Sequence, residues 1–123
     1  MDLLQSAHIH IRHFIEADLS QIETSAKTSP QFIELHTRNY EGAKTEQALA
    51  KELEILAKGC QQAIALGLRV NSGHGLTYWN VRPVVLLEGM EELNIGHTVI
   101  SRAVLVGMER AVLEMKKAML GQV

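Results

Sequence analysis

Four short apolar segments alternate with longer helical patterns along the chain, and no other feature of the sequence limits its fold as strongly. This alternation is typical of βαβ units, in which helices connect parallel strands and cover the sheet that they form. The expected strands are residues 8–15, 32–36, 68–71 and 92–95. The 123 residues contain no linker or low-complexity tract, so we expect a single domain, residues 1–123, around one core.

The clearest helical pattern runs from about residue 45 to residue 66. Its apolar residues advance by three or four positions, as in a helix that covers a sheet, and they are Leu49, Leu53, Leu56, Cys60 and Ile64. We expect Gly67 to end this helix. The other predicted segments are a helix capped by Asp18, a polar loop over residues 37–44, a short helix with Pro83 in its first turn, and one last helix from Gly96-His97 through Leu120.

Polar residues recur at alternate positions of the expected strands, whereas a parallel strand covered on both faces is normally apolar throughout. Because side chains alternate between the faces of a strand, one face is polar and the other apolar. The polar set is Glu16, Glu34, His36, Arg69, Asn71 and Asn94, and the apolar set is Ile9, Ile11, Ile15, Ile33, Leu35, Leu68, Val70, Leu93 and Ile95. We expect the apolar set to pack on the helices. The polar set then faces a barrel interior, or water if the sheet is open or antiparallel.

Glu34 is the most informative member of the polar set. Burial of an unpaired carboxylate is costly, so a glutamate inside a sheet must be paired, hydrated or directed at a ligand.

Two turns that combine glycine and histidine follow the third and fourth expected strands, at residues 72–75 and 96–97. Glycine lets the backbone approach a ligand, and the second turn opens onto the N-terminus of a helix, which attracts anions. Consecutive strand ends lie side by side, so we expect the turns to form one phosphate site. Histidine can donate a proton near neutral pH, which makes His74 a candidate acid. The alternative role for His74 is a structural hydrogen bond within the loop. For His97 we consider this structural role and a role in the phosphate site about equally well supported.

Charge and composition limit the partners and the location that we expect for this chain. The net charge is -2 and the basic residues are scattered, so we expect neither a nucleic-acid nor a membrane partner. The first residues lack the pattern of a secretory signal, so the expected location is the cytoplasm. Cys60, the one cysteine, lies on an apolar helix stripe and is predicted to be a core residue rather than a nucleophile.

Three histidines near the N-terminus raise the possibility of a metal site. His8 and His10 share one side of the expected first strand, and His13 lies close by. No carboxylate or cysteine occurs at ligand spacing, so we interpret them as edge or surface histidines and expect no metal or other cofactor.

The two turns and the strands before them resemble the signature stretches of pyridoxine 5'-phosphate synthases. The stretches are VNSGHGLTY at residues 70–78 and ELNIGH at residues 92–97, and residues 14–18, 32–37, Tyr40 and 43–45 fit the same family. The resemblance covers residues 14 to 120 and is weaker before Phe14.

This resemblance implies a TIM-type (βα)8 barrel in which the chain forms the last four βα units, a parallel half-barrel. It implies a transferase-type condensation of 1-deoxy-D-xylulose 5-phosphate with 3-amino-2-oxopropyl phosphate to pyridoxine 5'-phosphate, in vitamin B6 biosynthesis and without a cofactor. In the family's pattern His74 donates a proton and Glu34 stabilises a transition state. Gly75, Gly96 and His97 hold the 3-amino-2-oxopropyl phosphate.

The family's N-terminal half has no counterpart in these residues, so we expect an isolated copy to be inactive without that half. The open sheet edges favour pairing with another chain, either as a homo-oligomer or with the missing half-barrel. A half-barrel module that binds phosphorylated ligands without turnover is the alternative function. Two residues depart from the family's pattern: Ser72 stands where alanine is usual, and Arg38 where glycine is usual.

Overall fold

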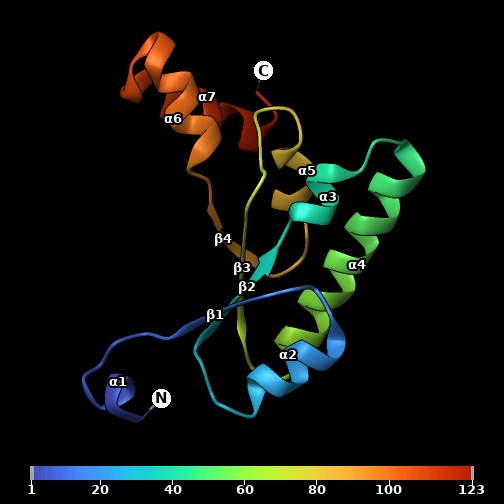
Figure 1. Cartoon of the computed structure of the whole chain (residues 1–123), viewed down its shortest axis with the longest axis vertical. Helices are drawn as coiled ribbons and strands as arrows, with labels where there is room; N and C mark the ends of the chain where they lie inside the picture. The colour runs from blue at the N-terminus through green and yellow to red at the C-terminus, as the bar shows by residue number, and fades with distance from the viewer. Residues whose placement is uncertain (1, 123) are drawn as a thin grey trace.

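The computed structural model describes residues 2–122, and within them four strands form one parallel sheet in the order β1-β2-β3-β4. The strands are β1 (Arg12–Ile15), β2 (Phe32–His36), β3 (Arg69–Gly73) and β4 (Met90–Asn94). Helices alternate with the strands along the chain (Figure 1). The predicted parallel α/β architecture is therefore confirmed.

β2 has the predicted bounds, but β1 is shorter than the sequence predicts. The sequence predicts a strand from residue 8, yet His8 has a left-handed φ of 58° and Ile9 is 50% exposed. Ile9 therefore lies outside the core, contrary to its place in the predicted apolar set. Ile11 is buried at 8% exposure and its backbone N–H donates to the side chain of Gln31 at 2.8 Å, just before β1 begins.

β3 continues two residues beyond its predicted end. Gly73 pairs with His36 of β2 and with Asn94 of β4, so residues 72 and 73 belong to the sheet rather than to a loop. The turn therefore begins at His74. β4 begins two residues earlier than predicted and ends at Asn94 instead of Ile95.

The helices are α1 (Asp2–Ser6), α2 (Leu19–Ala26), α3 (Arg38–Gly42), α4 (Glu46–Ala65), α5 (Val81–Val85), α6 (His97–Val106) and α7 (Met108–Leu120). The predicted cap of α2 and the predicted start of α4 near residue 45 are confirmed. Asp18 Oδ1 accepts the backbone N–H of Gln21 at 3.0 Å, and Thr45 Oγ1 accepts that of Ala48 at 3.1 Å. α4 also ends where predicted, with Gly67 following in the left-handed region at a φ of 78°.

Two helix predictions were wrong. The predicted loop over residues 37–44 contains α3, a single turn that is too short to show a periodic pattern. The predicted final helix is broken at Gly107, whose φ of 85° and ψ of 155° no helix can accommodate. The chain reverses there, so that α6 and α7 pack against each other.

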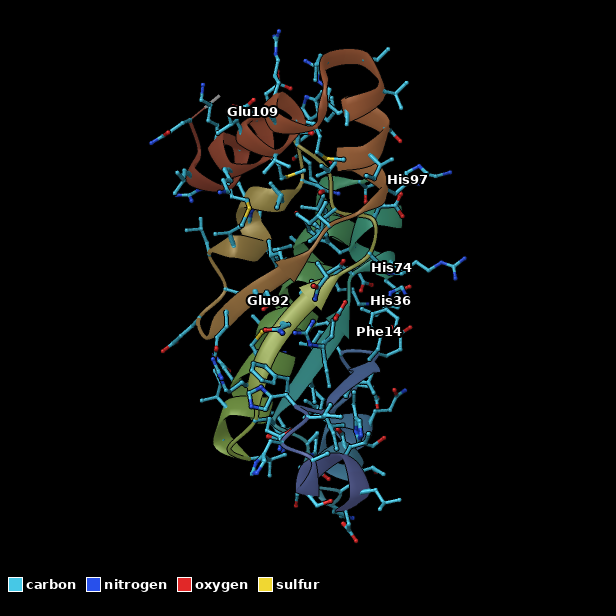
Figure 2. The ribbon with its side chains drawn as sticks, turned by 90° about the vertical axis from the view of Figure 1, so that its left-hand side faces the viewer. Phe14, His36, His74, Glu92, His97 and Glu109 are labelled. Carbon is cyan, nitrogen blue, oxygen red and sulfur yellow. The ribbon has the colours of Figure 1, made fainter. Side chains whose placement is uncertain are left out.

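The apolar face of the sheet packs on the helices, as predicted. Ile33, Leu35 and Val70 are fully buried in a cluster that includes Leu56 and Cys60 of α4. Burial also raises the pKa of the Cys60 thiol to about 11, which agrees with a core role. Figure 1 shows α2 and α4 to the right of the strands, and in Figure 2, turned by 90°, the opposite face of the sheet is towards the viewer and α4 lies behind the strands.

A second, smaller apolar cluster joins α5, α6 and α7. Its buried members are Val81, Val99, Ala111, Met115 and Ala118. Tyr78 packs against this cluster and its hydroxyl donates to the carbonyl of Ala111 at 2.9 Å. The cluster anchors the α6–α7 hairpin beyond the carboxyl end of β4. Among residues 2–122, no helix combines the length and the apolar character that crossing a membrane requires.

Candidate functional site

The predicted site residues lie around one pocket at the carboxyl ends of β2, β3 and β4. The pocket has a volume of about 670 Å³ and is lined by His36, Arg38, Glu41, His74, Gly75, Leu76, Thr77, Asn94, Ile95, Gly96, His97 and Thr98. His74 and His97 therefore lie at the same end of the sheet, as Figure 2 also shows. Four of the five residues predicted for the site, His74, Gly75, Gly96 and His97, line this pocket.

The turn after β3 has an unusual backbone. His74 has a φ of 78° and Gly75 a φ of 69°, so two consecutive residues occupy the left-handed region. This conformation costs about 1 to 2 kcal/mol for a residue with a side chain such as His74. Thr37 stabilises the turn through three contacts. Its backbone N–H and its hydroxyl both donate to the carbonyl of Gly73, at 3.0 and 2.6 Å, and the hydroxyl also contacts the carbonyl of His74.

Glycine is required at Gly73 and Gly75 for steric reasons. A Cβ on Gly73 would lie 2.5 Å from Glu34 Oε1 and 2.9 Å from the backbone oxygen of Asn94. A Cβ on Gly75 would lie 2.6 Å from the side chain of Glu41. At Gly96, by contrast, a Cβ would meet no atom within 4 Å. Gly96 therefore leaves open space in front of the first turn of α6, where His97 is the first helical residue.

Glu34 lies beneath the pocket and does not line it. Its side chain is 14% exposed, and its Oε2 accepts hydrogen bonds from Asn94 Nδ2 at 2.8 Å and from Arg12 Nη1 at 3.3 Å. Arg12 also pairs with Glu92 Oε1 at 3.0 Å. With its amide oxygen directed at Arg12, the buried Asn71 accepts from Nη2 at 2.9 Å. Three members of the predicted polar set, Glu34, Asn71 and Asn94, therefore belong to one network with Arg12, in which Glu34 is a paired carboxylate.

Three rings meet at the edge of the pocket, and two of them were not predicted as site residues. Phe14, His36 and His74 come from β1, from β2 and from the turn after β3, and their ring centroids are 4.8 to 5.3 Å apart. Figure 2 shows these three residues close together at the carboxyl end of the sheet. His36 was placed on the polar face by its position in the strand, and the same alternation places Phe14 there. Phe14 could thus have been found from the sequence.

The departures from the family's pattern fit the local structure. Arg38 is the first residue of α3, and its φ is not positive. Its backbone conformation therefore does not require glycine. Its backbone N–H donates to Nδ1 of His36 at 3.0 Å. Ser72 is buried, and its hydroxyl donates to the carbonyl of Leu35 at 2.8 Å, which ties β3 to β2 on the face opposite the pocket.

The histidines near the N-terminus have other neighbours. Nδ1 of His13 lies 2.8 Å from the hydroxyl of Ser25, and the ring of His10 lies 5.9 Å from that of Phe32. Among residues 2–122, no three histidine, cysteine, aspartate or glutamate side chains gather into a group that could hold a metal ion.

Comparison with known proteins identifies the family. Residues 1–121 match the family described as Pyridoxal phosphate biosynthesis protein PdxJ. The chain is 64% identical over 121 residues to the pyridoxine 5'-phosphate synthase of Cyanothece sp. strain PCC 7425, an alignment of 98% of this chain and 50% of that protein. It is 63% identical over all 123 residues to that of Gloeothece citriformis, of which it covers 51%, and 66% identical over 121 residues to that of Nostoc punctiforme, of which it covers 50%.

Two facts follow from these matches. The chain spans about half the length of the curated relatives that it matches, and the similarity extends through its first residues, beyond the range over which the motifs alone are recognisable. The chain belongs to the PdxJ family of pyridoxal phosphate biosynthesis proteins.

Proposed function

We propose that this chain forms the C-terminal half of a pyridoxine 5'-phosphate synthase and supplies its phosphate-binding and proton-donating residues. The observation that carries this proposal is that His74, Gly75, Gly96 and His97 all line one pocket. A pocket of about 670 Å³ can hold a small phosphorylated substrate.

The proposed phosphate site combines two kinds of donor. Gly75 exposes backbone to the pocket without a side chain, and Gly96 leaves open space before the first turn of α6. The free N–H groups and the dipole at the start of this ten-residue helix favour an anion. His97, the first residue of α6, lines the same space. These groups would hold the phosphate of 3-amino-2-oxopropyl phosphate.

The proposed reaction condenses this substrate with 1-deoxy-D-xylulose 5-phosphate, releasing inorganic phosphate and water as the pyridine ring of pyridoxine 5'-phosphate forms. His74 would donate a proton to a departing oxygen, since its ring lies at the pocket wall beside the phosphate site. Glu34 would act as a fixed negative charge below Gly73, where it could stabilise positive charge that develops in a transition state.

A complete site requires more strands in this proposal. β1 and β4 each have an unpaired edge within the described residues, and the polar network faces the open side of the sheet. Closing a (βα)8 barrel takes four more parallel strands, which correspond to the half of the relatives that these residues do not cover. We propose a soluble, cytoplasmic, oligomeric enzyme that is inactive without this second half.

Complementation tests the proposal. The chain is mixed with the N-terminal half of one of its relatives, both substrates are added, and pyridoxine 5'-phosphate is measured by its absorbance. We expect product only from the mixture. If the chain binds inorganic phosphate in this pocket but no complemented mixture turns over, the chain is instead a binding or assembly module.

The proton-donor assignment is tested by His74→Asn in the complemented mixture. Loss of the general acid should lower kcat by roughly 100- to 10,000-fold. His10→Asn is the control. The ring of His10 is exposed and contacts Phe32 at the other end of the sheet, so this substitution should leave kcat unchanged. Full activity of His74→Asn would exclude His74 as the donor.

A further inference from the structure

We propose that His36 is a positioning residue that, together with Phe14, holds the ring of His74 in place at the pocket wall. The effect on turnover rests on the proposed function of His74, whereas the effect on the order of its ring does not. The family's signature stretches assign no role to His36, and its ring, at the end of β2, packs against both of the other rings.

The packing of the three rings is close and mutual. The His36 centroid is 4.8 Å from that of Phe14 and 4.8 Å from that of His74, with interplanar angles of 39° and 44°. The ring of His74 is also 5.3 Å from Phe14, so it rests against two rings at once. Aromatic pairs in this distance range attract each other beyond the simple burial of their surface.

The ring of His36 is itself held by a hydrogen bond. The backbone N–H of Arg38 donates to its Nδ1 at 3.0 Å, so this nitrogen must carry a lone pair. The proton of the neutral ring is therefore on Nε2. Because the donor belongs to the backbone of α3, the ring plane of His36 is fixed by the fold and not by a mobile side chain.

His74 needs such support more than an ordinary surface residue does. Its φ of 78° is unfavourable, and Thr37 holds only the carbonyl groups of the turn. The imidazole of His74, by contrast, packs against the rings of Phe14 and His36. Thr37 and His36 are adjacent in the chain, so one short segment holds both the backbone and the ring of the proposed acid.

Loss of this support should reduce turnover more than binding. Rate falls steeply when a reacting group is displaced by about 1 Å, by as much as roughly 100-fold. The phosphate site would be unaffected, because Gly75, Gly96 and His97 do not depend on the ring of His36. His36 and His74 share the pocket with three further charged or titratable groups, Arg38, Glu41 and His97, and the variants below leave these in place.

Nuclear magnetic resonance of the full chain with labelled histidine tests the inference without any activity. We expect the nitrogen shifts of His36 to report a proton on Nε2, and the ring of His74 to show contacts with Phe14. In His36→Ala these contacts should be lost and the His74 side chain should sample several rotamers. His36→Phe keeps a ring and should retain them. His10→Ala removes a ring contact elsewhere and should change neither.

The same variants are then assayed in the complemented mixture. His36→Ala should lower kcat by roughly 10- to 100-fold with KM for 3-amino-2-oxopropyl phosphate within about twofold, and His36→Phe should recover most of this loss. An ordered His74 ring in His36→Ala would overturn the inference, as would a kcat loss in His36→Phe equal to that in His36→Ala. Absence of any activity in the parent mixture would refute the proposed function only, since the spectra still decide the inference.

Discussion

Arg12 of β1 and Glu92 of β4 form an ion pair at 3.0 Å although β2 and β3 lie between their strands. Neighbouring strands are about 4.8 Å apart, so this contact requires both side chains to reach across the open face of the sheet. The same Arg12 guanidinium also contacts Glu34 of β2 and Asn71 of β3. The guanidinium therefore links all four strands beneath the pocket.

Arg12→Met should destabilise the fold. Methionine keeps most of the length but leaves Glu34, which is 14% exposed, without its cation. Removing one partner of a fully buried pair costs about 3 to 5 kcal/mol, but Arg12 is 34% exposed, so we expect about 1 to 2 kcal/mol. Urea unfolding followed by circular dichroism measures this loss.

Lys58→Met is the matched control for Arg12→Met. Lys58 pairs with Glu54 one turn away on α4, and both side chains are about two-thirds exposed, at 64% and 65%. Exposed pairs of this type contribute little, so the unfolding midpoint should not move. Equal effects of the two substitutions would show that Arg12 has no special role in the sheet.

Gly73→Ala should be poorly tolerated, and Gly96→Ala should not disturb the fold. The new methyl group at Gly73 would lie 2.5 Å from Glu34 Oε1, so Glu34 or β4 must shift. Crowding of this kind costs about 1 to 3 kcal/mol. At Gly96 a methyl group meets no atom within 4 Å. Urea unfolding distinguishes the two, and an unchanged stability of Gly73→Ala would contradict the close approach of Glu34.

Thr37→Val tests the support of the turn after β3. Valine has nearly the same shape as threonine but no hydroxyl, so the carbonyls of Gly73 and His74 lose one donor in a fully buried position. We expect a loss of about 1 to 3 kcal/mol and faster hydrogen exchange in the turn. Thr24→Val, which loses a similar bond to Ser20 on the exposed side of α2, should have a much smaller effect.

The regular part of the fold could be predicted from the sequence because local and tertiary preferences agree there. From Ile33 onwards β2 alternates between apolar and polar residues, and α4 has a capping threonine, a long apolar stripe and Gly67 just after its end. Prediction failed where the local signal was short or ambiguous. Ile9, Ile11 and Ile15 all lie on one face of an extended chain and favoured a long first strand, yet only residues 12–15 of that segment pair with β2. The break between α6 and α7 at Gly107 was not predicted, because the apolar pattern of the helices continues on both sides of this residue.

The candidate site could be predicted in its backbone but not in its supporting contacts. The two glycine-histidine turns were recognisable as neighbours because parallel strands end at one edge of a sheet. The cluster of Phe14, His36 and His74 depends on how far each ring reaches over the edge, which strand parity does not specify. The position of Glu34 below Gly73, outside the pocket, likewise depends on the three-dimensional course of the Arg12 network.

Acid titration should reveal the ion-pair cluster that joins α6 to α7. Glu114 accepts from Arg102 at 2.7 and 3.1 Å and from Arg110 at 2.8 Å, and these bonds lower the pKa of its carboxyl from 4.5 to about 2. A carboxyl whose pKa is lower in the folded chain stabilises the fold above its unfolded value, and this contribution is lost as pH falls towards the folded value. Glu114→Gln should therefore be less stable than the parent at neutral pH.

The difference in stability between Glu114→Gln and the parent should shrink as pH falls from about 4.5 towards about 2, because the parent then loses the same charge. Urea midpoints measured across this range provide the test. In an Arg102→Gln background the Glu114 substitution should have a smaller effect at every pH, since Arg102 is the main cause of the lowered pKa. A difference that stays constant with pH would mean that Glu114 acts through packing, and the ion pairs between α6 and α7 would then contribute nothing to the stability of the hairpin.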